Sequence, residues 1–249
     1  TGTTSFLANE ASVKMEVTSG GVGSIVRQSY RCMPYQPGKG LLVLATFVMD
    51  SSGSANLTQR VGYFNTQNGV FFQKVDGTFS FVLRSYITGV ASDARTVTQA
   101  NWNGDKLDGT GQSGITLDVT KTQILFFDFE WLGVGAVRCG FIINGKFYNC
   151  HTFYNANTTN TVVYMQTAIL PLRYEINAIG TVAGTPVLQQ ICSTVISEGG
   201  YEQISQQYVG RLTSPFTLSS SNTFYPLVAM RLNASYLGAV VLPISTSFV

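Results

Sequence analysis

The chain has 249 residues and a net charge of +2, with 11% charged, 45% hydrophobic and 12% aromatic residues. This balance excludes a disordered chain, because disorder requires low hydrophobicity and high charge, and the small net charge gives no basic surface for nucleic acid. The longest apolar runs are about ten residues, too short to cross a bilayer. The chain begins without Met or an apolar leader, so we expect a processed portion of a longer polypeptide.

The first fifty residues predict short strands. Residues 1–24 form an N-terminal strand or linker region, in which residues 12–17 alternate between polar and apolar side chains and the glycines that follow indicate an exit turn. Residues 25–30 alternate again and predict another strand. Residues 41–49, LLVLATFVM, are an unbroken apolar run, which is typical of a strand covered on both faces.

Residues 62–88 predict three antiparallel strands. Asn68-Gly69 and Asp76-Gly77 mark the turns between them, because these residue types accept positive φ angles. In the third strand, alternate side chains fall on opposite faces: Phe79, Phe81 and Leu83 on one, and Ser80, Val82 and Arg84 on the other.

Residues 89–120 differ from the strands around them. They contain few long apolar runs and many Asp, Asn and Gly residues, so we expect a long surface loop with a helical turn near residues 99–102. Loops of this length are uncommon and often functional. The candidate residues of a contact surface in this loop are Trp102, Asp105, Lys106 and Asp108, since Trp side chains on loops are frequent platforms for sugars and proteins.

Residues 121–149 predict the centre of the fold. Residues 124–131 are mostly apolar and aromatic, as expected for a strand between two packed sheets. Asn144-Gly145 then supplies the two positive-φ residues of a type I′ turn, so a two-residue hairpin follows.

This hairpin gives a register for two of the four cysteines. Counting outward from Asn144-Gly145 places Cys139 opposite Cys150, within the distance range of a disulfide. Between a disulfide and two free thiols in an apolar core, we favour the free thiols. A zinc site is not expected, because the other two cysteines are remote and the chain has one histidine.

The last hundred residues predict further strands: TVVYMQT, LPLRYEINAIG, VLQQICSTVIS, TFYPLVAMRL and GAVVLPIST. The composition changes near Gly180, so we expect residues 25–180 to form the main domain and residues 181–249 a smaller C-terminal β module. No stretch shows helical apolar spacing over a normal helix length. The predicted fold is therefore all-β: an antiparallel β-sandwich or jelly-roll-like main domain followed by the smaller module.

The acidic residues of the long loop offer oxygen ligands for Ca²⁺. Asp105, Asp108 and Asp118 lie among glycines, as in many calcium sites. Their spacing does not match the EF-hand pattern, however, and Asp-Gly pairs favour turns. We therefore expect turns, and no metal or other cofactor.

The sequence offers two candidate catalytic arrangements. Asp128 and Glu130 share one face of a strand, and a pair of carboxylates is the requirement for glycoside hydrolysis. Both come from one strand, however, and we favour ion pairing with Arg138 or Arg173. A Ser-His-Asp mechanism would need His151, the one histidine, but the chain has no G-x-S-x-G motif to supply the serine. No catalytic residue is assigned, and we do not expect an enzyme.

Several segments together resemble a known family. They are YRCMPYQPGKG, QRVGYFNTQNGVFF, NWNGDKLDGTGQSGITLDVTKTQILFFDFEWLGVGAVRCGF, LPLRYEI and QICSTVISEGGYE, and together they cover roughly residues 27–200. This set resembles virion structural proteins of tailed phages, marine cyanophages especially, and of some large DNA viruses. The resemblance implies a capsid-attached fibre, decoration or tail component located in the virion, and it carries no catalytic motif.

Three functions are compatible with these observations. The leading one is a structural component of a virus particle that makes protein–protein contacts. The alternative is a carbohydrate-binding module on the virion surface for host attachment, which would use residues 95–116. A glycan hydrolase using Asp128 or Glu130 ranks lowest.

The expected partners are other virion proteins and, for the alternative, a host glycan; neither nucleic acid nor membrane is expected. The candidate edge strands VVYMQT and AVVLPIST carry no Lys or Glu to block pairing, so we also expect a homo-oligomer. Analogy with viral fibres gives three copies.

Overall fold

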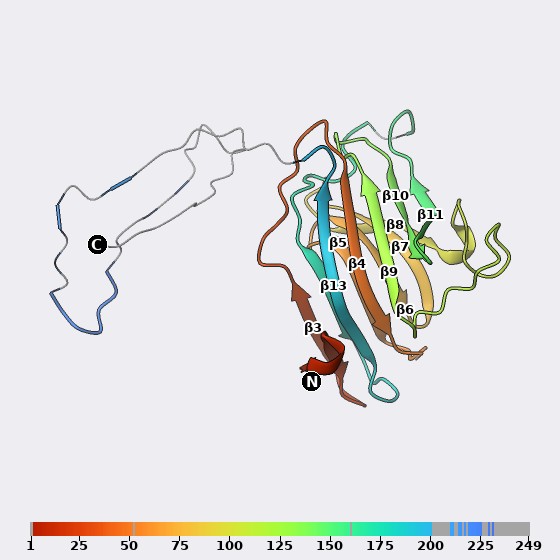
Figure 1. Cartoon of the computed structure of the whole chain (residues 1–249), viewed down its shortest axis with the longest axis horizontal. Coiled ribbons are helices and arrows are strands. Elements are labelled where there is room, and N and C mark those ends of the chain that lie inside the picture. Colours follow the sequence, from red (N-terminus) through yellow and green to blue (C-terminus); the bar gives the residue numbers. More distant parts are fainter. Residues whose placement is uncertain are drawn as a thin grey trace. The chain divides into compact units, whose positions relative to one another are not determined.

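The computed structural model describes residues 2–51, 53–159 and 161–200, together with 210, 211, 214, 215, 217, 219–225, 229 and 231 (Figure 1). The chain divides into two compact units, Thr1–Glu202 and Gln203–Val249. The first unit contains all the strands described below. Within the described ranges, no helix is long and apolar enough to span a membrane.

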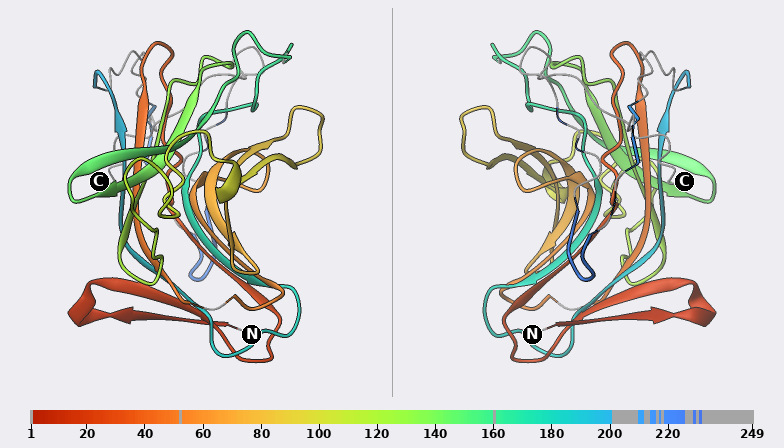
Figure 2. Two further views of the ribbon diagram at one scale, coloured as in Figure 1. Left: turned by 90° about the vertical axis from the view of Figure 1, so that its right-hand side faces the viewer. Right: turned by 90° about the vertical axis from the view of Figure 1, so that its left-hand side faces the viewer.

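The first unit is a sandwich of two antiparallel sheets, which lie on opposite sides of the core (Figure 2). One sheet has seven strands, in the order β1 (Gly2–Leu7), β2 (Ser12–Val17), β13 (Val187–Ser197), β4 (Leu41–Met49), β9 (Gln123–Phe129), β10 (Val137–Ile143) and β11 (Lys146–Phe153). The other has six, in the order β3 (Gly23–Gln28), β12 (Leu172–Ala178), β5 (Leu57–Phe64), β6 (Gly69–Val75), β7 (Thr78–Ser85) and β8 (Ser92–Thr98). Two short 3₁₀ turns, η1 (Ala8–Glu10) and η2 (Gln99–Asn101), complete the unit. The predicted all-β sandwich is confirmed.

The core is formed by the inward-facing side chains of both sheets. Along β4 every second residue is fully buried and the others are half-buried, so the apolar run has one core face and one partly solvated face. Aromatic rings join the sheets: the rings of Phe72 on β6 and Phe141 on β10 meet edge-to-face, with their centroids 5.3 Å apart. Each such side chain contributes about 1.5–3 kcal/mol by burial.

The hairpin β10–β11 has the predicted two-residue turn. Asn144 and Gly145 have φ angles of 52° and 75°, and Ile143 pairs with Lys146 across them. The outer part of the hairpin differs from the prediction, however. A β-bulge shifts the register after Gly140, so that Cys139 lies opposite His151 and Cys150 is the extra residue.

The predicted pairing of Cys139 with Cys150 is therefore wrong by one residue. Both side chains nevertheless enter the core, where both thiols are free and fully buried. Burial, and next to it the neighbouring Cys150, raises the pKa of Cys139, and burial raises the pKa of Cys150. The pair therefore consists of two protonated thiols in the core, as the prediction of free thiols has it.

The division of the chain differs from the boundary predicted near Gly180. β13 pairs with both β2 and β4 inside the seven-stranded sheet, and the two units divide after Glu202. The Gly-rich segment 180–186 is a loop that leads from β12 in one sheet to β13 in the other. Residues 1–24 are likewise integrated, because the β1–β2 hairpin lies at one end of that sheet.

The segment VVYMQT is not a strand. Its residues, 162–167, form bends and irregular backbone and belong to neither sheet. The segment AVVLPIST and half of TFYPLVAMRL lie outside the described residues. The outermost strands of the two sheets are instead β1, β11, β3 and β8. A homo-oligomer stays a prediction, but the prediction that copies pair through VVYMQT as an edge strand is wrong.

Candidate ligand-binding face

The outward side of the six-stranded sheet gathers charged side chains in a chain that has few of them. Strands β5, β6, β7 and β12 turn alternate residues away from the core, and the register brings these residues into rows across the sheet. We call this surface the arginine face, and it comprises Arg60, Phe64, Phe71, Gln73, Arg84, Asp93, Arg173 and Glu175.

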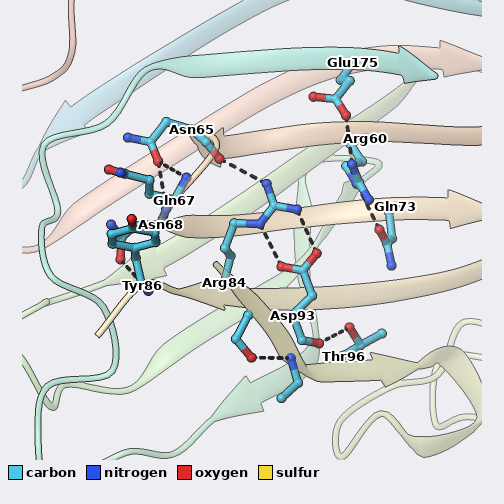
Figure 3. Close-up of polar contacts among 12 residues, drawn as sticks. Arg60, Asn65, Gln67, Asn68, Gln73, Arg84, Tyr86, Asp93, Thr96 and Glu175 are labelled. Carbon is cyan, nitrogen blue, oxygen red and sulfur yellow. Dashed lines mark hydrogen bonds and ion pairs between the residues drawn. The ribbon is translucent and has the colours of Figure 1, made fainter. Parts of the chain in front are cut away.

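One row of the arginine face is a continuous chain of hydrogen bonds. Glu175, Arg60, Gln73 and Ser80 stand opposite one another on four adjacent strands. Arg60 Nη1 donates to Glu175 Oε1 at 2.8 Å and its Nε donates to Gln73 Oε1 at 3.1 Å (Figure 3). Gln73 Nε2 then donates to Ser80 Oγ at 3.1 Å. The row holds each side chain in one orientation.

Glu175 is shared by two arginines. Besides the bond from Arg60, its Oε2 accepts hydrogen bonds from Arg173 Nε at 3.0 Å and Nη2 at 2.7 Å. Arg173 Nη1 donates to Gln28 Oε1 at 2.9 Å, on the neighbouring strand β3. Only 7% of Glu175 is exposed, so one carboxylate balances two guanidinium groups in a largely dehydrated setting.

A second ion pair stands at the β8 side of the face. Arg84 Nε and Nη2 donate to Asp93 Oδ1 and Oδ2, both at 2.7 Å, which is the bidentate geometry of a strong guanidinium–carboxylate pair (Figure 3). The remaining terminal nitrogen, Nη1, donates to the backbone oxygen of Asn65 at 3.1 Å. Arg84 is thereby fixed from both sides.

Two phenylalanine rings lie beneath the guanidinium groups. The rings of Phe64 and Phe71 are 4.5 Å apart and fully buried, although they point away from the main core. Arg84 lies 4.9 Å from the centre of Phe71, and Arg173 lies 5.5 Å from the centre of Phe64. Gly69, at φ 140°, stands opposite Phe64, and a Cβ there would lie 2.3 Å from the Phe64 Cβ. The glycine therefore leaves space for the ring.

Above this layer the surface is hollowed. The hollow has a volume of about 540 Å³ and is lined by Ser24, Thr66, Arg84, Ala91, Asp93, Arg173 and Glu175. Its volume falls within the roughly 300–1,000 Å³ of small-molecule sites. The two guanidinium groups of its lining are stacked on rings and bonded to the two carboxylates, so they are held in fixed directions toward a polar ligand.

Sequence reasoning missed this face. Its local signal was visible in β7, where Ser80, Val82 and Arg84 were expected to share the side opposite Phe79 and Phe81. The structure confirms that side as the outward one. The association with β12 depends on strand order, because Arg173 is far away in sequence and β12 pairs with β5.

The loop after β8, by contrast, is not the contact surface that the sequence suggested. Trp102 is 2% exposed, its ring lies 4.7 Å from that of Phe81, and its Nε1 donates to the backbone oxygen of Val97 at 3.1 Å. The interpretation of Trp102 as a surface platform is therefore wrong, because the indole fills the end of the core. The 3₁₀ turn η2 just before it was predicted correctly, whereas strand β8 was not.

The carboxylates of this loop hold turns. Asp105 accepts backbone hydrogen bonds from Leu107 at 3.0 Å and Ser113 at 2.7 Å, and Asp108 accepts from the backbone and hydroxyl of Thr110. Burial raises the pKa of Asp105, but the bonds from Leu107 and Ser113 outweigh it, so the net pKa lies below 3.8. The turn interpretation is confirmed for both residues. Over the described residues, no group of three or more His, Cys, Asp or Glu is arranged to hold a metal ion.

The same loop covers the exposed edge of β11. The side chain of Asn103 pairs with the backbone of Thr152 in both directions, at 2.9 and 2.8 Å. The next two backbone N–H groups, of Gly104 and Asp105, donate to the oxygens of Cys150 and Asn149. Lys106 follows, half-buried, and its oxygen accepts from Gln99. The loop thus bonds to backbone groups at an edge of the sheet that would otherwise be free to pair with another strand.

The other sequence candidates lie away from the arginine face. Asp128 faces outward on the seven-stranded sheet and forms an ion pair with Arg138, which confirms one of the two pairings expected. Glu130 is exposed just beyond β9. Arg173, the other expected partner, pairs with Glu175 instead.

His151 has a structural role. Its Nδ1 accepts a hydrogen bond from the backbone N–H of Asn103 at 3.3 Å, and its ring packs against Phe153 with 4.5 Å between centroids. Burial, and secondarily the positive charge of Arg95, lowers its pKa from 6.5 to about 4. The imidazole is therefore neutral at neutral pH and helps to hold the loop on β11.

This shift predicts a loss of stability in mild acid. Between pH 6.5 and about 4 the unfolded chain binds a proton at His151 and the folded chain does not. The contribution of the neutral imidazole to the free energy of unfolding is therefore complete above pH 6.5, and it is lost as the pH falls toward 4. The expected loss is about 3 kcal/mol. A His151→Gln variant keeps an acceptor but does not titrate, so urea unfolding should show a smaller loss across this range. Equal losses in both proteins would contradict the assignment.

Comparisons with known proteins define the fold but not a family. No protein-family model and no curated protein matches the chain. A solved structure described under endo-acting O-glycanases of prominent human gut microbiota matches with a TM-score of 0.50 at 10% identity, over 75% of this chain and 80% of that one.

Binding domains of botulinum neurotoxins also match. The serotype C1 domain has a TM-score of 0.46 at 9% identity, covering 79% of this chain, and a type C structure described by its interaction with two ganglioside molecules has a TM-score of 0.43 at 9% identity, covering 80%. The chain spans 43% and 42% of those two structures.

Proposed function

We propose that this chain is a carbohydrate-binding module and that the arginine face holds the glycan. The observation that carries the proposal is the hollow of about 540 Å³, lined by two guanidinium groups and two carboxylates fixed by mutual hydrogen bonds. Neighbouring hydroxyl groups of a sugar require alternating donors and acceptors in fixed directions. Charge-assisted bonds to such groups are about twice as strong as neutral ones.

The geometry favours binding over hydrolysis. Each carboxylate of the hollow is already paired, Asp93 with Arg84 and Glu175 with two arginines, which suits a fixed acceptor. The two candidate carboxylates for hydrolysis lie on the other sheet: Asp128 is in β9 and Glu130 follows it. The shared fold with a structure from work on O-glycanases is compatible with a sugar ligand, and the proposal rests on the hollow itself.

The resemblance to virion structural proteins suggests the biological setting. A glycan-binding module on the surface of a virus particle would attach the particle to its host, while other parts of the same protein contact neighbouring virion proteins. Virion localisation and these contacts stay predictions, as does a trimer. The proposal moves the glycan site from the loop of residues 95–116 to the arginine face.

A glycan array with the purified full chain tests the proposal. We expect binding to a restricted set of glycans. An Ala91→Trp variant fills the hollow without removing any ion pair, so it should bind at least about tenfold more weakly, a change of about 1.4 kcal/mol. Ala100→Trp places the same side chain on an exposed position of η2 and should bind like the wild type. An array without binding, or equal binding by both variants, would favour a purely structural particle component.

A further inference from the structure

The arginine face carries more positive than negative charge. It holds three guanidinium groups, of Arg60, Arg84 and Arg173, and two carboxylates, of Asp93 and Glu175, so its formal charge is 3 − 2 = +1. Among the described residues, the ionisable side chains that line the hollow are Arg84, Asp93, Arg173 and Glu175, and Arg60 bonds to Glu175 from outside the lining. Arg84 and Asp93 neutralise each other, and the excess therefore lies where Arg60 and Arg173 share Glu175.

The excess charge is also shielded from water. The side chains of Arg84, Arg173 and Glu175 are 11%, 14% and 10% exposed. Charges in such surroundings interact more strongly than on an open surface, because the effective dielectric constant is lower. A ligand that supplies one negative charge here gains more than it would at an exposed arginine.

Hydrogen-bond donors remain free beside this charge. A guanidinium group has five N–H bonds, and Arg173 uses three of them, for Glu175 and Gln28. Arg84 also uses three, for Asp93 and Asn65. Among the described residues, each therefore keeps two N–H bonds without an acceptor, on terminal nitrogens, and both arginines line the hollow.

These donors are held in place before a ligand arrives. Arg84 is stacked over Phe71 and Arg173 over Phe64. Each guanidinium group also makes three hydrogen bonds to neighbouring groups. A preorganised donor loses little conformational entropy on binding. Planar guanidinium groups also match the geometry of carboxylate and sulfate oxygens.

We propose that the hollow binds an acidic sugar, whose carboxylate or sulfate ester group lies against the free N–H bonds of Arg84 and Arg173. This inference rests on the proposed glycan-binding function and specifies the class of glycan. The anion completes the charge balance of the arginine face, and the remaining hydroxyl groups of the sugar contact Asp93 and the polar rim formed by Ser24 and Thr66.

Matched ligand pairs test the inference by isothermal titration calorimetry with the full chain. One pair is an oligogalacturonate and its carboxyl-reduced, neutral counterpart; the other is a sulfated galactan oligosaccharide and its desulfated counterpart. We expect the acidic member of at least one pair to bind at least about tenfold more tightly, and added salt to reduce this preference. The pair that shows the preference identifies the group as carboxylate or sulfate.

Variants at Ala91 isolate the charge without disturbing the arginine network. Ala91→Asp places a negative charge at the lining of the hollow and should remove most of the preference for the acidic ligand. Ala91→Asn has the same size without the charge and should keep it, as should Ala100→Asp on η2.

The outcomes separate the two proposals. If glycans bind but the acidic and neutral members of both pairs bind equally, or if Ala91→Asp behaves like Ala91→Asn, the acidic-sugar inference is wrong and glycan binding stands. If no glycan binds on the array and none of the four oligosaccharides binds in the calorimeter, the proposed function itself fails.

Discussion

Replacing Trp102 with Ala is expected to lower the free energy of unfolding by about 3–5 kcal/mol, the usual range for removing a buried Trp side chain. The indole is 2% exposed and packs on Phe81 at the end of the core. Its removal leaves a cavity and deprives the backbone oxygen of Val97 of a donor. The neighbouring residue Asn103, which pairs with β11, also loses its anchor.

Urea unfolding followed by fluorescence or circular dichroism measures this effect. Tyr30→Ala is the matched control, since it removes another aromatic side chain from a fully exposed position and should change stability by less than about 0.5 kcal/mol. If Trp102→Ala were as stable as the control but defective in ligand binding, Trp102 would be a contact residue and its buried placement would be contradicted.

Local structure was predictable wherever the residues of one short segment determine its conformation. Asn144-Gly145 is an example, because a type I′ turn needs two residues at positive φ and few other pairs provide them. The three strands of residues 62–88 are another, since their turns are short and their faces alternate. The short helical turn at residues 99–101 was also found.

Features that depend on exact register were not predictable. The bulge at Cys150 adds one residue to β11, and nothing in the hairpin sequence indicates it. Counting from the turn is reliable only until the first such insertion. In the structure the bulge coincides with the place where the loop residue Gly104 bonds to Cys150, so its context comes from a distant segment.

Features that depend on strand order were even less accessible. β13 looked like part of a separate module because a glycine-rich loop precedes it, yet it lies in the middle of the seven-stranded sheet. The arginine face illustrates the consequence for function. Arg84 and Arg173 are separated by many residues of sequence and become neighbours of one hollow only through the order β12–β5–β6–β7.

Glu175→Gln is expected to lower the free energy of unfolding by about 3 kcal/mol or more, since breaking a buried ion pair leaves a charge without a partner. Here the substitution leaves two guanidinium groups, of Arg60 and Arg173, without their counter-charge. The glutamine is similar in size and still offers one oxygen, so the loss measures charge rather than packing. Urea unfolding at neutral pH provides the value.

The chain offers a closely matched control in Lys14 and Glu16. They too are two residues apart on one strand and form an ion pair, of 2.8 Å, but their side chains are 34% and 28% exposed, compared with 14% and 10% for Arg173 and Glu175. Exposed pairs contribute at most about 1 kcal/mol, so Glu16→Gln should have a small effect. Equal losses for the two variants would show that Glu175 is screened by water, and the dehydrated, preorganised charge on which the acidic-sugar inference depends would not exist.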